Sequence, residues 1–438
     1  MHEIPSRFRA QFTDRFINYV RGTGEMMIQI EMDFNSRLDV TRLEKALDVT
    51  LDAEPILGCR LVERWWRPQW ERLGKNEREV LIITEDTAVY EKFKHASINT
   101  YEGPQLKACL LHSAQGDRLL MKVAHEVADA SGVRQIACIA SSIYSRLAHE
   151  PQYHPVPNVN GDRSTWQVLR HVPWHAYPTI VYNYFRLYMI PVCFPIVTAQ
   201  LPIVEDNDRT LQFTSRDIPV DMSKRMIEYG RQRNGTLNDI ILASYFHAIA
   251  AASNWNRRSQ LRLRVTVDLR RFKPDSNGNG ICNLSGMEVI DLGTDLNDDF
   301  NHTLKRISSF MHRRKATWIG INDYAVLAPT TVFLPHEVMR KVIHFGVQSS
   351  IKVKQAPYVF TNMGAIEPGE VTFDVPPIEA RFLPPVNYPP HIIFCFSSYK
   401  GSLNVAAGTW PCSREHVDRC LDGMVKILTS LTSGVDAA

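Results

Sequence analysis

The chain has 438 residues, of which 44% are hydrophobic and 22% are charged, and its net charge is +3. This composition excludes a disordered chain, and the weak net charge gives no support for nucleic-acid binding. The length predicts about three ordinary domains or two large α/β halves. The eight cysteines are widely spread and form no C-x-x-C pair, so we expect neither a zinc site nor a redox motif.

The first elements are predicted by hydrophobic periodicity. Residues 26–34 alternate between apolar and polar side chains, which predicts a half-buried strand. A helix with one apolar face follows from residue 40, with Asp39 as its N-cap and Pro55 at its end. Residues 56–62 are predicted as a strand. The chain therefore opens with a strand, a helix and a strand.

A hairpin is predicted next, and it leads into the candidate site. Residues 106–112 and 118–124 are two apolar runs around a turn that contains glycine. The second strand ends at His125-x-x-x-Asp129, and a helix is predicted to start near Val133. A neutral imidazole at a strand end is suited to general-base chemistry near pH 7. The spacing alone also fits a core histidine followed by a capping aspartate.

The middle of the chain is unusual in composition. Residues 149–172 are rich in proline, histidine and asparagine, which is typical of a linker. The following segment, 176–204, carries one charge, Arg186, and many aromatic residues. Its longest proline-free run, Thr179–Ile190, is shorter than the ~20 residues that span a bilayer. Two interpretations stay open, a buried apolar crossover and an interfacial element that faces lipid.

The remaining sequence predicts a second α/β unit from about residue 209. Its expected elements are a helix over 237–252 capped by Thr236, strands over 261–267, 287–292 and 358–362, a helix over 300–311, a hairpin of 392–399 with 403–407, and a last helix capped by Ser413.

Five short motifs occur in one order along the chain. They are Leu43-Glu-Lys-Ala-Leu47 with Glu54-Pro-Ile-Leu-Gly-Cys-Arg60, Gly103-Pro-Gln-Leu106 with His125-x-x-x-Asp129, Thr236-Leu-Asn-Asp-Ile-Ile-Leu-Ala243, Val265-Thr-Val-Asp-Leu-Arg270, and Phe360-Thr-Asn-Met-Gly364. Together they resemble the CoA-dependent acyltransferase superfamily. That superfamily includes chloramphenicol acetyltransferase, the condensation domains of peptide synthetases, and related alcohol and lipid acyltransferases.

The resemblance implies a fold and a domain arrangement. The expected fold is α/β, with two chloramphenicol-acetyltransferase-like halves, each a mixed sheet with helices, that meet at a central tunnel. The expected boundaries are 1–170 for the N-terminal half with the H-x-x-x-D motif, 171–208 for an apolar, proline-rich crossover, and 209–438 for the C-terminal half.

The resemblance also implies a reaction and its site. His125 is expected to be the general base of an acyltransferase that moves an acyl group from a thioester to a hydroxyl or amine, without an acyl-enzyme. Asp129 and Arg270 are expected to pair and to shape the site. Thr361 and Asn362 are candidates for binding the oxyanion or lining the tunnel. Neither a permanently bound cofactor nor a metal is expected, because acyl-CoA or an acyl-carrier-protein thioester serves as co-substrate.

Two departures from the family pattern leave alternatives open. Ala124 stands where condensation domains usually carry a first histidine, and Ala130 stands where glycine usually follows the aspartate. The alternatives are a condensation enzyme that uses a carrier protein, and an inactive relative that acts as a binding or scaffold protein.

The expected partners and location follow from these features. The partners are the acyl thioester, a small-molecule or lipid acceptor, a carrier protein in the alternative reaction, and no nucleic acid. Segment 176–204 is a candidate for peripheral membrane contact. We expect a cytoplasmic location because the first residues lack an apolar run of the secretory type.

Overall fold

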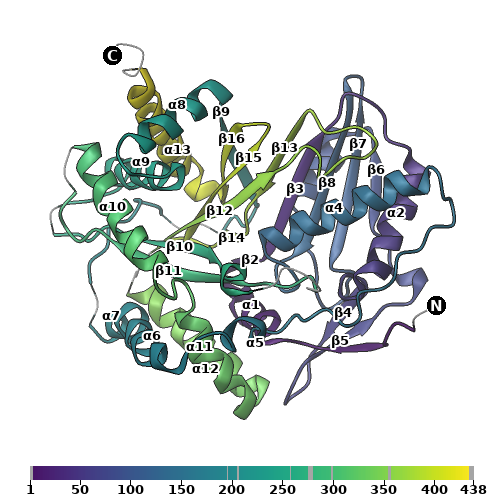
Figure 1. Cartoon of the computed structure of the whole chain (residues 1–438), viewed down its shortest axis with the longest axis horizontal. Coiled ribbons are helices and arrows are strands. Elements are labelled where there is room, and N and C mark those ends of the chain that lie inside the picture. The colour runs from purple at the N-terminus through teal and green to yellow at the C-terminus, as the bar shows by residue number, and fades with distance from the viewer. Residues whose placement is uncertain are drawn as a thin grey trace.

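Two mixed β-sheets, each with its own helices, form the two lobes of the computed structural model (Figure 1). The structure describes residues 3–194, 196–204, 207–256, 258–274, 280–296, 299–353 and 357–433. This is the α/β architecture that the motifs predict. The N-terminal lobe lies on the right of Figure 1 and the C-terminal lobe on the left.

The N-terminal sheet has five strands in the order β13-β3-β8-β7-β6. Their bounds are β3 (Met27–Asp33), β6 (Leu81–Thr84), β7 (Leu106–Ser113), β8 (Gly116–Ala124) and β13 (Glu379–Leu383). β6 and β7 are parallel, and the other neighbours are antiparallel. The predicted hairpin is confirmed as β7 and β8. Helices α2 (Val40–Ala53) and α4 (Ala130–Leu147) cover one face of this sheet (Figure 1).

The polar face of β3 is buried, so the prediction of a half-buried strand is wrong. Side chains of helix α3 (Thr87–His95) and of the neighbouring strand β13 supply hydrogen-bond and ion-pair partners for the polar residues on that face. Glu31 accepts hydrogen bonds from Tyr90 Oη at 2.7 Å, Lys94 Nζ at 2.9 Å and Arg381 Nε at 2.7 Å. Burial alone would raise the pKa of Glu31, but Lys94, Arg381 and these hydrogen bonds lower it to about 2.

The C-terminal sheet has six strands in the order β11-β10-β12-β15-β16-β9. Their bounds are β9 (Gln212–Ile218), β10 (Arg262–Asp268), β11 (Ser285–Asp291), β12 (Tyr358–Ile366), β15 (Ile392–Tyr399) and β16 (Ser402–Thr409). β12 is parallel to both β10 and β15, and the other pairs are antiparallel.

Helices cover both faces of this sheet. The helices that form the large core are α8 (Val220–Arg231), α9 (Leu237–Ala252), α10 (Phe300–Lys315) and α13 (Pro411–Ser433). Thr236 caps α9 as predicted, and its hydroxyl accepts a hydrogen bond from Asp239 N at 3.3 Å. Helices α11 (Asn322–Phe333) and α12 (His336–Lys352) lie against the other face, where Arg264 of β10 donates to Ser350 of α12 at 3.2 Å.

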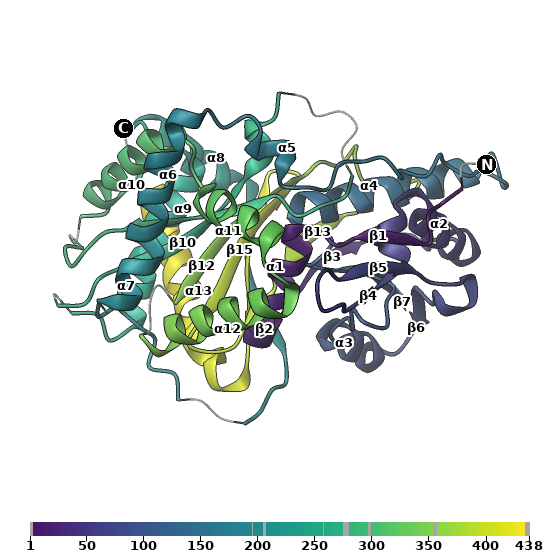
Figure 2. The same ribbon diagram turned by 90° about the horizontal axis from the view of Figure 1, so that it is seen from below.

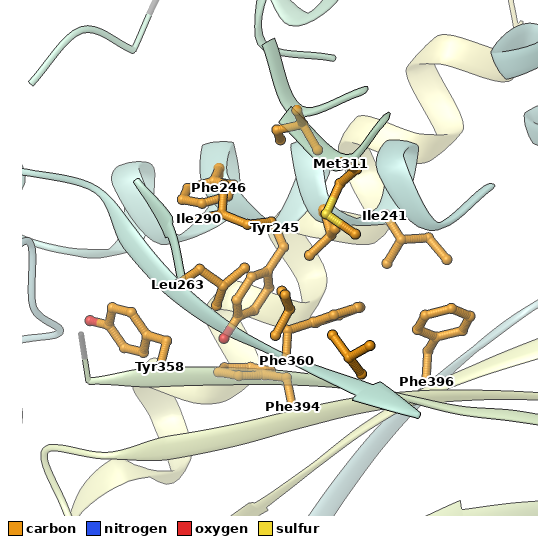
Figure 3. Close-up of a cluster of buried hydrophobic side chains, with 14 of the residues drawn as sticks. Ile241, Tyr245, Phe246, Leu263, Ile290, Met311, Tyr358, Phe360, Phe394 and Phe396 are labelled. Atoms are coloured by element: carbon orange, nitrogen blue, oxygen red, sulfur yellow. The ribbon is translucent and has the colours of Figure 1, made fainter. Parts of the chain in front are cut away.

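An aromatic cluster lies at the centre of the C-terminal core (Figure 3). The Tyr245 ring of α9 packs against Phe394 with centroids 4.5 Å apart and against Phe360 at 5.4 Å. Such rings bury a large apolar area and prefer tilted contacts. Tyr358 lies in the same cluster, and its hydroxyl accepts a hydrogen bond from Leu201 N at 2.7 Å.

Replacing Tyr245 by phenylalanine is expected to raise the free energy of unfolding by about 1 kcal/mol. The side chain is 0% exposed, and within the described residues its hydroxyl has no hydrogen-bond partner. Tyr358→Phe is the matched control and should lower the stability by roughly 1–2 kcal/mol, because Leu201 N loses its acceptor. Urea unfolding measures both, and a destabilised Tyr245→Phe protein would contradict the prediction.

Short elements connect the lobes. Strands β1 (Arg7–Arg9), β4 (Cys59–Val62) and β5 (Gln69–Arg72) form a three-stranded sheet, and β2 (Gly24–Glu25) pairs with β14 (Val386–Asn387). The strand predicted over 56–62 is shorter, because Pro55 starts a 3-10 turn through Gly58. The predicted order of strand, helix and strand is correct. The second strand, β4, nevertheless belongs to the small three-stranded sheet, whereas β3 belongs to the five-stranded sheet.

The apolar crossover is helical and only partly buried. It contains α6 (Tyr177–Tyr184), a π-helical turn (Phe185–Met189) and α7 (Ile190–Cys193), and the short helix α5 (Trp166–Leu169) precedes it in the linker. Ile180 and Leu187 are buried, whereas Tyr182 and Phe185 are exposed. One side of this segment therefore packs against the lobe, and the other side is exposed. Among the described residues, no helix combines the length and hydrophobicity needed to cross a bilayer.

Candidate active site

The turn from His125 to Asp129, called here the His125 turn, joins the end of β8 to the start of α4. His125 N donates to Met26 O at 3.0 Å, which fixes the turn to the neighbouring segment. Helix α4 begins at Ala130, three residues before the predicted start near Val133. The reason is that Asp129 caps the helix, since its Oδ1 accepts a hydrogen bond from Gly132 N at 2.9 Å.

The His125 ring has a defined orientation. Its Nδ1 lies 2.9 Å from Ala128 O. A carbonyl oxygen only accepts hydrogen bonds, so Nδ1 carries a proton, and in the neutral form of the ring the lone pair is on Nε2. The side chain is half-buried. This tautomer leaves Nε2 as the basic atom of the ring.

The Asp129 carboxylate is held by donors from both lobes. Oδ1 accepts from Gly132 N, while Oδ2 accepts from Leu284 N at 2.7 Å and from Arg270 Nη1 at 2.8 Å. The ion pair that the resemblance implies between Asp129 and Arg270 is therefore present. Burial alone would raise the pKa of Asp129, but Arg270 and the two backbone N–H groups hold it below its usual value.

Residues 281–284, called here the seam loop, complete the site from the C-terminal lobe. Besides the bond from Leu284 N, Cys282 O accepts from Arg270 Nη2 at 3.0 Å, and Asn283 Nδ2 donates to His125 O at 3.4 Å. Neither periodicity nor the motifs predicted a role for this loop. Its contacts to Asp129 and Arg270 use backbone N–H and C=O groups, which every sequence supplies.

Arg163 is a second feature that sequence reasoning missed. Its guanidinium forms two hydrogen bonds with Asp14 at 3.0 Å each. It also donates to Val127 O at 3.4 Å and to Ile281 O at 2.6 Å. Arg163 therefore joins α1 (Phe12–Val20), the His125 turn and the seam loop. Only its charge within the predicted linker could have attracted attention.

Glu54 lies at the same seam. It is buried, Asn158 Nδ2 donates to its Oε1 at 2.9 Å, and the backbone N–H of Ile281 donates to the same carboxyl group. Burial raises the pKa of Glu54 to about 7, and these donors only partly oppose the rise. A buried carboxyl group thus links the two lobes and a residue of the linker.

Glu54 is expected to make the stability fall as the pH rises from about 5 to 7. The folded chain keeps the proton up to about pH 7, whereas an unfolded chain releases it near 4.5, so alkaline conditions favour unfolding. Glu54→Gln, which is neutral at every pH, should flatten this dependence by up to about 3 kcal/mol. Urea unfolding at pH 5 and pH 8 measures the effect. Glu44 is exposed, so Glu44→Gln is the control. If the free energy of unfolding changed equally with pH in the two variants, the raised pKa of Glu54 would be refuted.

Thr361 and Asn362 lie on β12 of the C-terminal sheet. Thr361 is buried and accepts a hydrogen bond from Thr266 Oγ1 at 2.8 Å, which leaves its own hydroxyl hydrogen available. Asn362 is exposed and lies at a bulge before Gly364, whose φ is 86°. Arg134 of α4 donates to Ala365 O at 2.9 Å. Within the described residues, no hydrogen bond connects Thr361 or Asn362 to His125.

Comparison with known proteins gives the following matches. Residues 281–432 match the WS/DGAT C-terminal domain family, while no curated protein sequence matches the chain. The fold is similar to the epimerization domain from the third module of tyrocidine synthetase B, with TM-score 0.68, 14% identity, and coverage of 99% of this chain and 98% of that chain. It is also similar to trichothecene 15-O-acetyltransferase from Fusarium sporotrichioides (TM-score 0.71, 11% identity, 97% and 95% covered).

A third similar structure is polyketide synthase associated protein 5 from Mycobacterium tuberculosis, with TM-score 0.66, 14% identity and 98% of each chain covered. The chain has the fold of the CoA-dependent acyltransferase superfamily. The family match and the fold support a general role in acyl transfer. The matched region starts at Ile281, the first residue of the seam loop.

Ala130, which departs from the superfamily motif, fits its position without strain. It is the first residue of α4, and the non-glycine residues with positive φ in the described parts of the chain are Asn234, Asp374 and Lys400. A helical φ suits alanine as well as glycine. Steric restriction lies instead at Gly132, where a Cβ would come 3.0 Å from Ala128 Cβ and 3.3 Å from Cys282 O.

No cluster of three or more His, Cys, Asp or Glu side chains that could hold a metal occurs in the described part of the chain.

Proposed function

We propose that this protein transfers an acyl group from a thioester, acyl-CoA, to a hydroxyl or amine acceptor, with His125 as general base. The observation that carries the proposal is the 2.9 Å contact between His125 Nδ1 and Ala128 O, which places the lone pair of the neutral ring on Nε2. A superfamily fold and a WS/DGAT match over 281–432 support the reaction class.

The proposed reaction is a direct transfer. His125 Nε2 takes the proton from the acceptor O–H or N–H as the acceptor attacks the thioester carbonyl carbon. The tetrahedral intermediate then expels the thiolate, the C–S bond breaks, and the imidazolium returns its proton to sulfur. No acyl-enzyme forms, so the reaction needs neither a serine nor a cysteine nucleophile.

The other site residues have supporting roles in this proposal. Asp129 is engaged by three donors, so it holds the His125 turn and does not accept a substrate proton. The available hydroxyl hydrogen of Thr361 makes it the better oxyanion donor of the two candidates, with Asn362 as a residue of the tunnel wall.

The alternatives differ in the donor and in activity. In the condensation alternative the donor is a carrier-protein thioester. The epimerization domain of tyrocidine synthetase B is the structural neighbour that motivates this alternative. The inactive-scaffold alternative rests on Ala130, which is the first residue of α4 and has no positive φ.

Release of free thiol from defined donors tests the proposal. The full-length chain is incubated with acyl-CoA, or with the same acyl group on a carrier protein, and with a panel of alcohols and amines. We expect acceptor-dependent thiol release from acyl-CoA and a matching mass increase of one acceptor. Release only from the carrier protein would favour the condensation reading, and no release from either donor would favour the scaffold reading.

A further inference from the structure

Exposed apolar side chains occur on two helical segments of the C-terminal lobe. They come from the crossover (Tyr182, Phe185 and Ile190) and from α12 (Val338, Val342 and Phe345), and these six residues define what is called here the apolar face. Helices α6 and α11 are in contact, and α12 follows α11 directly. These helices form the lower left edge of Figure 1 and face the viewer in Figure 2.

Helix α12 has one more apolar stripe than a surface helix needs. Met339 and Ile343 are buried against Tyr19 of α1 and supply the usual inward stripe. Val338, Val342 and Phe345 form a second stripe at spacings of four and three residues, and Phe345 is 74% exposed. Since packing within the lobe does not use this second stripe, α12 presents an apolar surface outward.

A loop of the N-terminal lobe extends the same surface. Trp66 O accepts a hydrogen bond from His336 N at 3.0 Å, and Arg67 Nη2 donates to Val332 O at 3.3 Å. These bonds hold Trp65 and Trp66 beside the start of α12, with Trp65 64% exposed. Indole rings are enriched where an apolar phase meets water.

The charges around the apolar face are predominantly positive. The sequence has no acidic residue between Asp162 and Glu205, so the crossover contributes only basic and neutral side chains. On α12, Arg340 and Glu337 form an ion pair at 2.6 Å that adds no net charge, while Lys341 and His344 are exposed. Cations flanking an apolar stripe are typical of helices that lie on anionic lipid surfaces.

We propose that the apolar face docks the protein peripherally on an anionic lipid surface. Helix α12 and the crossover lie in the plane of the interface, with Phe185, Val342 and Phe345 at the headgroup boundary and the basic side chains toward the headgroups. The crossover alone was the expected contact; α12 and the tryptophan loop enlarge it. The inference does not depend on the acyl transfer reaction.

Vesicle flotation of the full-length chain tests this proposal. The probes are phosphatidylcholine vesicles with and without a substantial fraction of phosphatidylglycerol. We expect the wild type to float with the anionic vesicles and Val342→Glu/Phe345→Glu to partition at least about tenfold less, because each side chain loses a burial worth roughly a factor of ten. Ile227→Glu on α8 is the matched control and should float like the wild type, since Ile227 is an exposed helical residue at the opposite edge (Figure 1).

Three results would overturn the proposal. One is a wild-type chain that floats with neither kind of vesicle. Another is a double variant that floats to the same extent as the wild type. The third is a wild-type dimer in sedimentation that the double variant dissociates, without vesicle binding, which would assign the face to a second copy of the chain. Both variants change exposed residues, so unchanged unfolding curves establish that they are folded. Flotation requires no turnover, so its failure leaves the proposed reaction untouched.

Discussion

Replacing His125 by alanine is expected to reduce acceptor-dependent thiol release by about 10²–10⁴-fold. The substitution removes Nε2, the basic atom of the tautomer that the hydrogen bond from Nδ1 to Ala128 O selects. Thiol release from acyl-CoA, measured at saturating acceptor, is the test.

The control distinguishes lost chemistry from lost structure. His154 is an exposed histidine of the linker, so His154→Ala should react like the wild type. Unfolding curves for His125→Ala should stay close to the wild type, because the turn is also fixed through His125 N and through Asp129. Equal thiol release by wild type and His125→Ala would remove the catalytic assignment.

Replacing Asp129 by alanine is expected to lower the free energy of unfolding by about 3–5 kcal/mol. The change leaves the Arg270 guanidinium without its main counter-charge and strips Gly132 N and Leu284 N of their acceptor. Urea unfolding gives the value. The exposed pair of Glu228 and Arg231, at 3.0 Å, is the control, and its loss should cost less than about 1 kcal/mol.

The same carboxylate sets a pH dependence on the acid side. The pKa of Asp129 is lowered in the folded chain, so its stabilisation is fully present above the ordinary value near 3.8 and is lost as the pH falls through the lowered one. Wild-type stability should therefore fall more steeply than that of Asp129→Asn below about pH 4. A loss of activity in Asp129→Ala without any loss of stability would contradict the structural role and indicate a direct part in the chemistry.

Elements with a clear period could be predicted from the sequence. The hairpin of β7 and β8 and the helix after Thr236 follow from apolar spacing and from one capping side chain, which are local properties. His125, Asp129 and Arg270 were predicted because their motifs keep the superfamily order. The resemblance also implied the ion pair between Asp129 and Arg270, 141 residues apart, and the structure confirms it.

Other features depend on contacts between distant segments. The polar face of β3 looks solvent-facing by periodicity, and it is buried because Arg381 arrives from a strand near the other end of the chain. Helix α12 was missed because its two apolar stripes leave no single polar face. The seam loop acts largely through its backbone, so no pattern of side chains could reveal it.

Strand β13 has a consequence for biosynthesis. It supplies residues Glu379–Leu383 to the sheet whose other strands end at Ala124, and it pairs with β3 along five residues. A ribosome therefore releases the first sheet with β3 as an open edge, and more than half of the chain must follow before the closing strand emerges. Open edges pair readily with foreign strands. The nascent chain thus keeps an unpaired edge strand late into translation, and we expect it to be most prone to misassembly before β13 emerges.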